Sequence, residues 1–248
     1  MKTGLTSVTF RKKSIEEIVR LTREAGLTGI EWGGDVHVAP GDTNAAQRAA
    51  LLCREAGLEV LSYGSYFYAD EGEDFAPILS SARALGAPVI RIWPGRKTYE
   101  DSTPEEFAAL ADRIRAAGEM AAAAGIKIGF EYHVRTATQT KEGAVALLKA
   151  VNLPNVGCYW QPSPIIPFEE HLAELRAISP WLLNLHVFHL SPDYTSHLLA
   201  DGAEPWAAYL KEAASIPGRH DLILEFVKDE ADSSFEADAA TLRSWTEK

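Results

Sequence analysis

Hydrophobic and polar positions follow two alternating periods along this chain. Short runs rich in Val, Ile and Leu are each followed by a longer Ala-, Glu- and Arg-rich stretch with helical spacing of its apolar residues. Eight such pairs occur, and their strand-like runs begin near Leu5, Gly29, Val60, Val89, Ile128, Val156, Leu183 and Ile223. Repeated strand–helix units build a parallel sheet. Eight of them predict a single α/β domain, residues 1–248, folded as a (β/α)₈ TIM barrel.

The predicted helices are Ser14–Ala25, Asn44–Ala56, Phe75–Leu85, Pro104–Ala124, Lys141–Val151, Phe168–Ile178, Ala203–Ala214 and Phe235–Thr246. Several ends carry local signals. Ser14 and Glu17 fit a capping box, and Pro104 follows the N-cap residue Thr103. Four helices are followed by a glycine suited to a left-handed C-terminal position, at Gly26, Gly57, Gly86 and Gly125.

A doubly wound open sheet is the alternative architecture. It is disfavoured because no GxGxxG motif follows the first strand. The longer connecting segments come after strands rather than after helices, and in a barrel these segments form the active face.

Composition narrows the class of protein. The chain is 46% hydrophobic and 24% charged, with no linker-like segment, which is typical of one soluble globular domain. Two cysteines outside any CxxC pair fit a reducing compartment, and neither a signal-like start nor a membrane-length apolar run is present. We therefore expect a cytoplasmic protein that does not bind membranes.

The net charge of −11 bears on partners. Nucleic-acid binding depends largely on Lys and Arg that neutralise phosphates, so nucleic acid is not expected as a partner. A small molecule is the expected partner, and the sequence leaves homo-oligomerisation open.

Alternation within the strands sorts side chains into two sets, because residues two apart share a face. One set is apolar and is expected to pack against helices: Ile30, Trp32, Ile90, Ile92, Ile128, Phe130, Cys158, Trp160, Leu185, Val187, Leu224 and Phe226. The other set is polar and aromatic and is expected to face the barrel axis: Glu31, Arg91, Trp93, Glu131, His133, Tyr159, Gln161, Asn184, His186 and Glu225.

The inward set contains a candidate metal site. Glu131 and Glu225 lie in apolar surroundings, where an ionised carboxylate is costly unless a cation or hydrogen bonds compensate it. Gln161 and His186 lie on the two strands between them. Taken singly, each also fits a plain structural role, such as a salt-bridged glutamate or a hydrogen-bonded core histidine; together they predict one divalent ion.

The remaining polar residues are candidates for substrate binding. Arg91 is the only inward cation, and it could balance the carboxylates or bind a substrate oxygen. His37 lies in the loop after the second strand, where a surface role fits equally well. Aromatic residues near strand ends could wall a sugar ring: Trp32, Tyr63, Tyr66, Phe67 and Trp93.

Five motifs on these strands resemble the xylose isomerase-like TIM-barrel superfamily, in its sugar phosphate isomerase/epimerase group. They are Gly29-Ile-Glu-Trp-Gly33, Phe130-Glu-Tyr-His133, Tyr159-Trp-Gln-Pro162, Leu185-His-Val-Phe188 and Leu224-Glu-Phe226. The resemblance covers essentially the whole chain. It implies metal ligands Glu131, Gln161, His186 and Glu225, with Gln161 in place of the family's Asp.

The departures weaken parts of this resemblance. The family often has a His three residues after the Asp, where this chain has Pro164. A neutral amide oxygen still binds hard cations, but one negative charge is lost and affinity should fall. His133 and Glu31 resemble substrate-side polar positions. The ligand set does not distinguish Mn, Mg, Co, Zn and Fe.

The function expected from this resemblance is metal-dependent isomerisation or epimerisation of a small ketose, sugar acid or polyol-derived substrate. Glu131 and Glu225 would move the proton through a metal-stabilised enediolate, with Glu31, Arg91, Trp93, His133 and His37 binding substrate. A dehydratase or lyase of the same superfamily is the alternative. An apurinic-site endonuclease and a non-catalytic sugar-binding protein are less favoured, the former because of the net charge.

Overall fold

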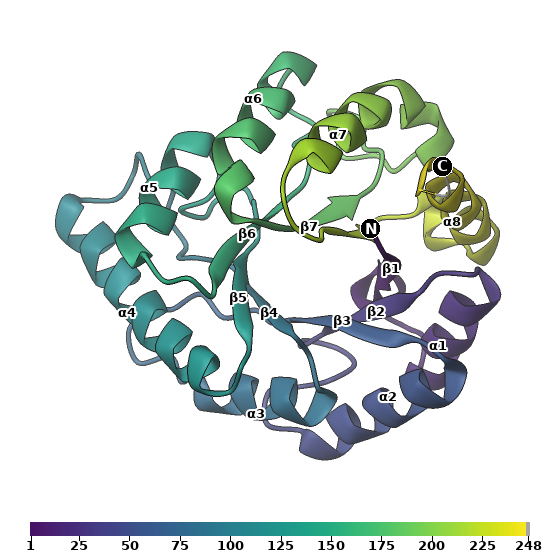
Figure 1. Ribbon diagram of the computed structural model, residues 1–248, viewed down its shortest axis with the longest axis horizontal. Helices are drawn as coiled ribbons and strands as arrows, with labels where there is room; N and C mark the ends of the chain where they lie inside the picture. The colour runs from purple at the N-terminus through teal and green to yellow at the C-terminus, as the bar shows by residue number, and fades with distance from the viewer. Residues whose placement is uncertain (247–248) are drawn as a thin grey trace.

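The computed structural model describes residues 1–246 and shows a closed barrel of eight parallel strands. Each strand pairs with its neighbour in the sequence, and the first pairs with the last (Figure 1). The strands are β1 (Thr3–Thr6), β2 (Gly29–Gly33), β3 (Glu59–Gly64), β4 (Val89–Ile92), β5 (Lys127–Phe130), β6 (Val156–Trp160), β7 (Leu182–Val187) and β8 (Asp221–Leu224). The predicted (β/α)₈ barrel is confirmed.

Eight α-helices surround the strands as an outer ring (Figure 1). They are α1 (Ile15–Glu24), α2 (Thr43–Ala56), α3 (Ala76–Leu85), α4 (Pro104–Ala123), α5 (Lys141–Val151), α6 (Phe168–Ile178), α7 (Ala203–Ser215) and α8 (Asp232–Thr246). Short 3₁₀ helices interrupt the loops: η1 (Ser7–Phe10), η2 (Ser179–Trp181), η3 (Leu199–Gly202) and η4 (Lys228–Glu230). No helix within residues 1–246 is both long and apolar enough to cross a bilayer.

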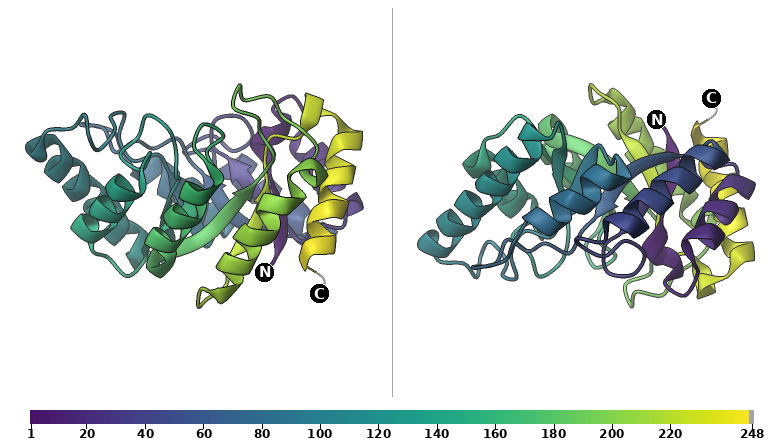
Figure 2. Two further views of the ribbon diagram at one scale, coloured as in Figure 1. Left: turned by 90° about the horizontal axis from the view of Figure 1, so that it is seen from above. Right: turned by 90° about the horizontal axis from the view of Figure 1, so that it is seen from below.

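The local signals at the helix ends act as expected. Ser14 and Glu17 form a reciprocal capping box at α1, and the glycines after α2 and α3 are left-handed, with φ of 73° at Gly57 and 70° at Gly86. The largest boundary difference is at α8, which begins at Asp232 rather than at Phe235. The helices lie beside the barrel when it is viewed from the side, and loops extend beyond the ends of the strands (Figure 2).

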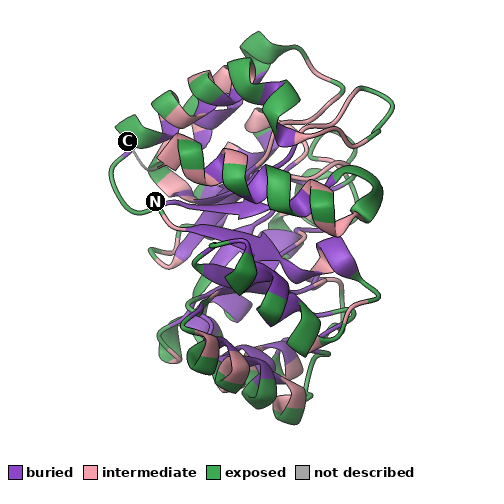
Figure 3. Ribbon diagram, turned by 90° about the vertical axis from the view of Figure 1, so that its right-hand side faces the viewer, coloured by how far each residue is buried: buried purple, intermediate pink, exposed green. Residues whose placement is uncertain are grey.

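Two apolar regions lie on the two sides of the strands. Outward residues such as Trp32, Phe130 and Trp160 are fully buried between the sheet and the helices. A smaller cluster fills the inside of the barrel: Leu61, Val89, Tyr159 and Ile223. Figure 3 shows the strands at the centre as buried and the outer faces of the helices as exposed. The inside cluster forms an apolar floor beneath the polar residues that follow.

One expected packing position is wrong. Phe226 was predicted to pack against helices, but β8 ends at Leu224 and Phe226 has φ of 54° and is 46% exposed. The left-handed backbone at Phe226 breaks the strand alternation, so the parity of β8 does not extend to this residue. Its ring instead lines a pocket at the end of the barrel.

Candidate metal and substrate site

The polar residues of the inner face meet at the carboxyl ends of the strands. His186 lies within β7, whereas Glu131, Gln161 and Glu225 directly follow β5, β6 and β8. Because all strands run in the same direction, these ends share one rim of the barrel. His186 and the three side chains contact one another there, as the sequence predicted.

Three oxygen atoms converge on one ring nitrogen of His186. Its Nδ1 lies 3.0 Å from Gln161 Oε1, 3.3 Å from Glu225 Oε2 and 3.8 Å from Glu131 Oε1. The other nitrogen, Nε2, faces Glu31 Oε1 at 3.2 Å. An ionised carboxylate only accepts hydrogen bonds, so Nε2 carries a hydrogen toward Glu31. In the neutral ring, Nδ1 then directs a lone pair toward three electron-rich oxygens.

The orientation of the Gln161 amide is fixed by its second contact. Gln161 Nε2 donates a hydrogen bond to the main-chain oxygen of Tyr132 at 2.9 Å. A carbonyl oxygen accepts hydrogen bonds only, so the amide nitrogen must face Tyr132 and the amide oxygen must face His186. Gln161 Oε1 therefore faces His186 Nδ1, while Gln161 Nε2 makes a second, longer hydrogen bond to Glu131 Oε1 at 3.4 Å.

This arrangement fits a divalent cation. Glu131, His186 and Glu225 each offer a ligand atom within 4.8 Å of the others, and all three residues are buried. Within residues 1–246, Glu225 Oε2 is buried with no donor except His186 Nδ1 in its protonated form, which is costly unless a cation or proton compensates it. Mixed carboxylate, amide and imidazole donors suit several divalent metals. Glu31 is hydrogen-bonded to the far nitrogen of His186, the position of a carboxylate that would orient this imidazole toward a metal ion.

The electrostatic environment of His186 is also consistent with a cation at its Nδ1. Burial alone would lower its pKa, but the charges of Glu225 and Glu31 outweigh burial and raise the pKa to about 10. The surroundings therefore favour a positive charge at Nδ1. A proton and a divalent ion are alternative ways to supply that charge.

Glu31 and Arg91 form a buried ion pair next to the candidate metal ligands His186 and Glu131. Arg91 Nε donates to Glu31 Oε1 at 3.1 Å, and the two side chains are 2% and 0% exposed. Burial alone would raise the pKa of Glu31, but Arg91 and His186 lower it to about 2. Gly64 on β3 makes room for this pair, since a Cβ at Gly64 would lie 2.6 Å from Arg91 Nη2.

Glu131 is held by two further donors. Arg91 Nη1 and the Trp93 indole N–H both donate to Glu131 Oε2. Burial would raise its pKa, but Arg91 and His186 lower it. A carboxylate that accepts two such donors is a weak base, so the geometry suits Glu131 as a ligand more than as a proton acceptor.

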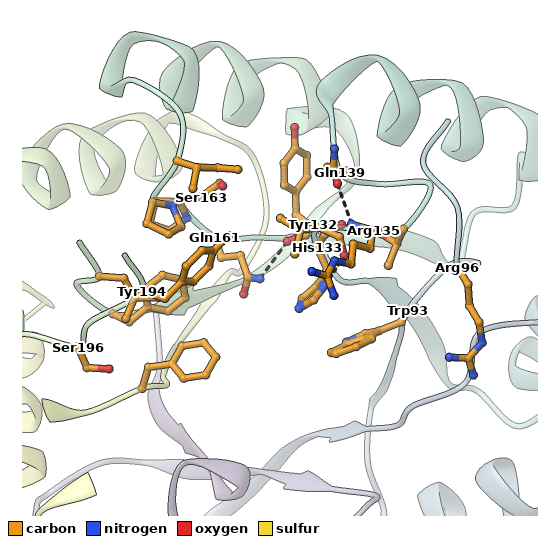
Figure 4. Close-up of a pocket in the computed structure, with 18 of the residues that line it drawn as sticks. Trp93, Arg96, Tyr132, His133, Arg135, Gln139, Gln161, Ser163, Tyr194 and Ser196 are labelled. Carbon is orange, nitrogen blue, oxygen red and sulfur yellow. Dashed lines mark hydrogen bonds between the residues drawn. The ribbon is translucent and has the colours of Figure 1, made fainter. Parts of the chain in front are cut away.

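A pocket of about 930 Å³ opens beside this cluster (Figure 4). On one wall the His133 ring stacks on Trp93, with centroids 4.1 Å apart and an interplanar angle of 23°. His133 Nδ1 lies 2.7 Å from the main-chain oxygen of Val134. That oxygen can only accept, so Nδ1 carries the hydrogen and, in the neutral ring, Nε2 keeps a free lone pair.

The predicted substrate residues are not all at this pocket. Of these, Trp93 and His133 line it, together with the predicted metal ligand Gln161. Glu31 and Arg91 lie behind it, buried and engaged with each other and with the ligand residues. His37 is elsewhere, with Nε2 3.0 Å from the main-chain oxygen of Lys13.

Pocket residues that the sequence interpretation did not select come from the loops after the strands. They are Tyr68, Arg96, Arg135, Tyr194, Ser196 and Phe226, among others. Arg135 follows His133 by two positions, and this closeness to a predicted site residue was the available signal. The loop that carries Tyr194 and Ser196 gave none, because its conformation depends on a short bridge between Leu190 and Ser196.

The fold and the cluster together define a (β/α)₈ barrel with a candidate metal centre at the carboxyl ends of its strands. The sequence profile of the xylose isomerase-like TIM barrel family matches residues 19–245. The chain belongs to this family, which confirms the resemblance found in its motifs.

Named relatives within this fold are enzymes. A 3-dehydroshikimate dehydratase from Bacillus anthracis is 24% identical over 210 residues, covering 77% of this chain and 72% of the relative. The crystal structure of the probable 3-DHS dehydratase from Bacillus anthracis has a TM-score of 0.83 at 21% identity, covering 98% of this chain and 99% of that one. An L-ribulose 3-epimerase structure has a TM-score of 0.75 at 18% identity, covering 99% and 94%. Other structures with this fold hold zinc or magnesium.

Proposed function

We propose that this protein is a metal-dependent dehydratase that acts on a small β-hydroxy carbonyl compound. The observation that carries the proposal is the contrast between His133 and Glu131. His133 lines the pocket with Nε2 free, whereas Glu131 is engaged by Arg91 and Trp93. One free base beside a carbonyl-binding centre suits elimination, which requires proton removal at a single carbon.

The ion is assigned to Glu131, Gln161, His186 Nδ1 and Glu225. When bound, a divalent ion supplies a Lewis acid that stabilises negative charge developing on a substrate carbonyl oxygen. Glu31 holds the far nitrogen of His186, and Arg91 holds Glu31 and Glu131. These buried contacts fix the ligand side chains in place before the substrate arrives.

His133 Nε2 then takes the proton from the carbon next to the carbonyl, and that C–H pair of electrons forms the new carbon–carbon double bond. The C–O bond to the β-hydroxyl breaks, and protonated His133 returns its proton to the departing hydroxide as water. Stacking on Trp93 and the Nδ1–H bond to Val134 hold the ring in one orientation. The balance is one substrate to one dehydrated product and one water.

The relative named as a 3-dehydroshikimate dehydratase supports this choice among the activities of the family. The similarity is low, so the proposal depends on the pocket geometry.

Isomerisation or epimerisation is the second candidate. Glu131 and Glu225 both offer a carboxylate oxygen at the candidate metal centre, so two carboxylates are available beside the reaction centre. A nuclease with several metal ions is less favoured, because residues 1–246 hold one group of three metal-binding side chains. An inactive sugar-binding protein would require that these groups move no proton.

The test is incubation of metal-loaded protein with a panel of β-hydroxy carbonyl compounds, 3-dehydroshikimate included, in D₂O. Mass spectrometry should find a product that has lost one water, together with solvent deuterium in recovered substrate. Deuterium uptake with inversion or carbonyl migration, and without loss of water, would favour the epimerase candidate. Neither water loss nor exchange across the panel would contradict both.

His133→Asn is the matched variant for this assay. It should retain the metal and lose dehydration, because the amide cannot accept a proton at neutral pH. His37→Asn, at a histidine outside the pocket, should behave as wild type in the same assay.

A further inference from the structure

The wall of the pocket has a charge that differs from that of the whole chain. The protein carries 35 Asp and Glu against 24 Lys and Arg. Among the described residues, those that line the pocket include Arg96, Arg135 and His133 but no Asp or Glu. The carboxylates of the site lie deeper, around His186. A ligand that enters this pocket therefore meets guanidinium groups at the mouth and the candidate metal centre further in.

The two arginines are not equivalent. Arg96 is already engaged, since its Nε donates to Asp70 at 2.7 Å and its guanidinium lies 3.5 Å from the Tyr68 ring centroid. Arg135 forms no ion pair within the part of the chain that the structure describes, and its one hydrogen bond as a donor is through the main chain. Arg135 is therefore the guanidinium that remains available to a ligand.

The turn that carries Arg135 is held by side-chain hydrogen bonds. Arg135 has φ of 62°, and its main-chain N–H donates to Gln139 Oε1 at 2.7 Å. Thr136 Oγ1 donates to the His133 main-chain oxygen at 2.7 Å, and Thr138 Oγ1 donates to the Glu131 main-chain oxygen at 2.5 Å. A left-handed non-glycine residue costs free energy, so this conformation persists only where surrounding contacts fix it. The contacts tie Arg135 to the same turn as the metal ligand and the pocket base.

The opposite wall is aromatic and apolar. Figure 4 shows Trp93, His133 and Arg135 on one side of the pocket, with Tyr194 and Ser196 on the other. Phe188 and Phe226 also line it, with ring centroids 5.3 Å apart. Flat faces on both sides suit a ring or a planar conjugated group.

We propose that the substrate carries a carboxylate, and that Arg135 binds it while the other end of the substrate reaches the metal centre. This inference rests on the proposed function and adds a substrate class to it. A carboxylate is planar and matches one guanidinium through two parallel hydrogen bonds. A phosphate dianion would be expected to have several cationic partners, and Arg96 is already paired with Asp70.

The test is a binding measurement that does not depend on turnover. 3,4-Dihydroxybenzoate is a suitable probe, because its vicinal oxygens mimic a planar enediol and its carboxylate lies across the ring. 3,4-Dihydroxybenzamide is the neutral counterpart, and 3,4-dihydroxyphenylphosphonate is the phosphate-like one. Calorimetry on the metal-loaded protein should give tightest binding for the benzoate.

Arg135→Gln should weaken benzoate binding by about tenfold or more and leave benzamide binding within about twofold, because only the charged contact is lost. Unchanged benzamide binding also shows that the pocket is intact. Arg54→Gln is the control, since Arg54 is an exposed arginine in the last turn of α2 and forms no ion pair with any residue from 1 to 246. It should change neither affinity.

Four results would overturn the proposal: no binding of the benzoate, equal affinity of benzoate and benzamide in the wild type, equal losses for both in Arg135→Gln, or tighter binding of the phosphonate. Selective benzoate binding by a protein that dehydrates nothing would keep this inference and remove the proposed function. The two failures are therefore distinguishable.

Discussion

Arg91 offers the sharpest test of the buried charge network, through the substitution Arg91→Met. The methionine side chain is apolar and roughly fills the space of the arginine stem, but it leaves Glu31 and Glu131 without their shared cation. Both carboxylates are almost fully buried, with 0% and 3% exposure. Removing one partner of a buried ion pair leaves an uncompensated charge, which is strongly destabilising.

The magnitude follows from the structure in two ways. Breaking a buried pair typically costs about 3–5 kcal/mol. Independently, the pKa of Glu31 lies at about 2 against an ordinary value of 4.5, a difference that corresponds to about 3 kcal/mol of stability at neutral pH. Arg91 and His186 share that effect. We therefore expect Arg91→Met to lower the free energy of unfolding by about 3 kcal/mol or more at neutral pH.

The assay is urea unfolding of metal-free protein at several pH values. Because the folded-state pKa of Glu31 is lowered, its contribution is present above about pH 4.5 and is lost as the pH falls toward 2. The difference between wild type and Arg91→Met should narrow over that window. Arg20→Met is the control, since the Arg20–Glu24 pair is exposed and should contribute less than about 0.5 kcal/mol.

A loss below about 1 kcal/mol at neutral pH would refute the reasoning, because it would mean that water or another cation already compensates the two carboxylates. A difference that stays constant from neutral pH to about pH 3 would refute the assignment to Glu31.

Three further predictions concern a candidate metal ligand, the proposed catalytic base and a buried glutamate. Gln161→Glu places a negative charge where an amide oxygen faces His186. The affinity for a divalent metal, measured by calorimetry, should therefore rise by about tenfold or more. Unchanged or weaker binding would remove Gln161 from the ligand set. His133→Asn should lower kcat by about 10²–10⁴-fold with metal content unchanged, and a parallel loss of metal would instead indicate a structural role. Burial raises the pKa of Glu174 to about 7, so ionisation of this carboxyl lowers the free energy of unfolding as the pH rises from 4.5 through 7. Glu174→Gln should therefore stabilise the protein by about 1–3 kcal/mol at pH 8 and not at pH 4. A gain of the same size at both pH values would contradict the burial effect.

The barrel could be predicted from the sequence because its signals are local and repeated. The capping box at Ser14 and the glycines that end several helices fixed element boundaries, and the strand alternation placed Glu131, Gln161 and His186 on one face. These features depend on neighbours within a few residues. The sequence therefore predicted the fold and the meeting of these side chains, whereas their role as metal ligands stays a prediction.

What the sequence did not reveal depends on contacts between distant segments. The pairing of Arg91 with both Glu31 and Glu131 joins three strands, so it could not be distinguished from substrate binding. The alternation along its strand predicted that Phe226 packs against helices, but its left-handed backbone places the ring in the pocket. The position of Arg135 depends on a turn in which its main-chain N–H binds Gln139, and the hydrophobic periodicity of the sequence does not predict this turn.

The central claim is that one divalent ion is bound between β5, β6, β7 and β8. Anomalous diffraction from crystals soaked with Mn²⁺ tests it most directly. We predict one strong peak within bonding distance of Glu131, Gln161 Oε1, His186 Nδ1 and Glu225. A peak at another location, or none at this rim with the four side chains still in contact, would contradict the account.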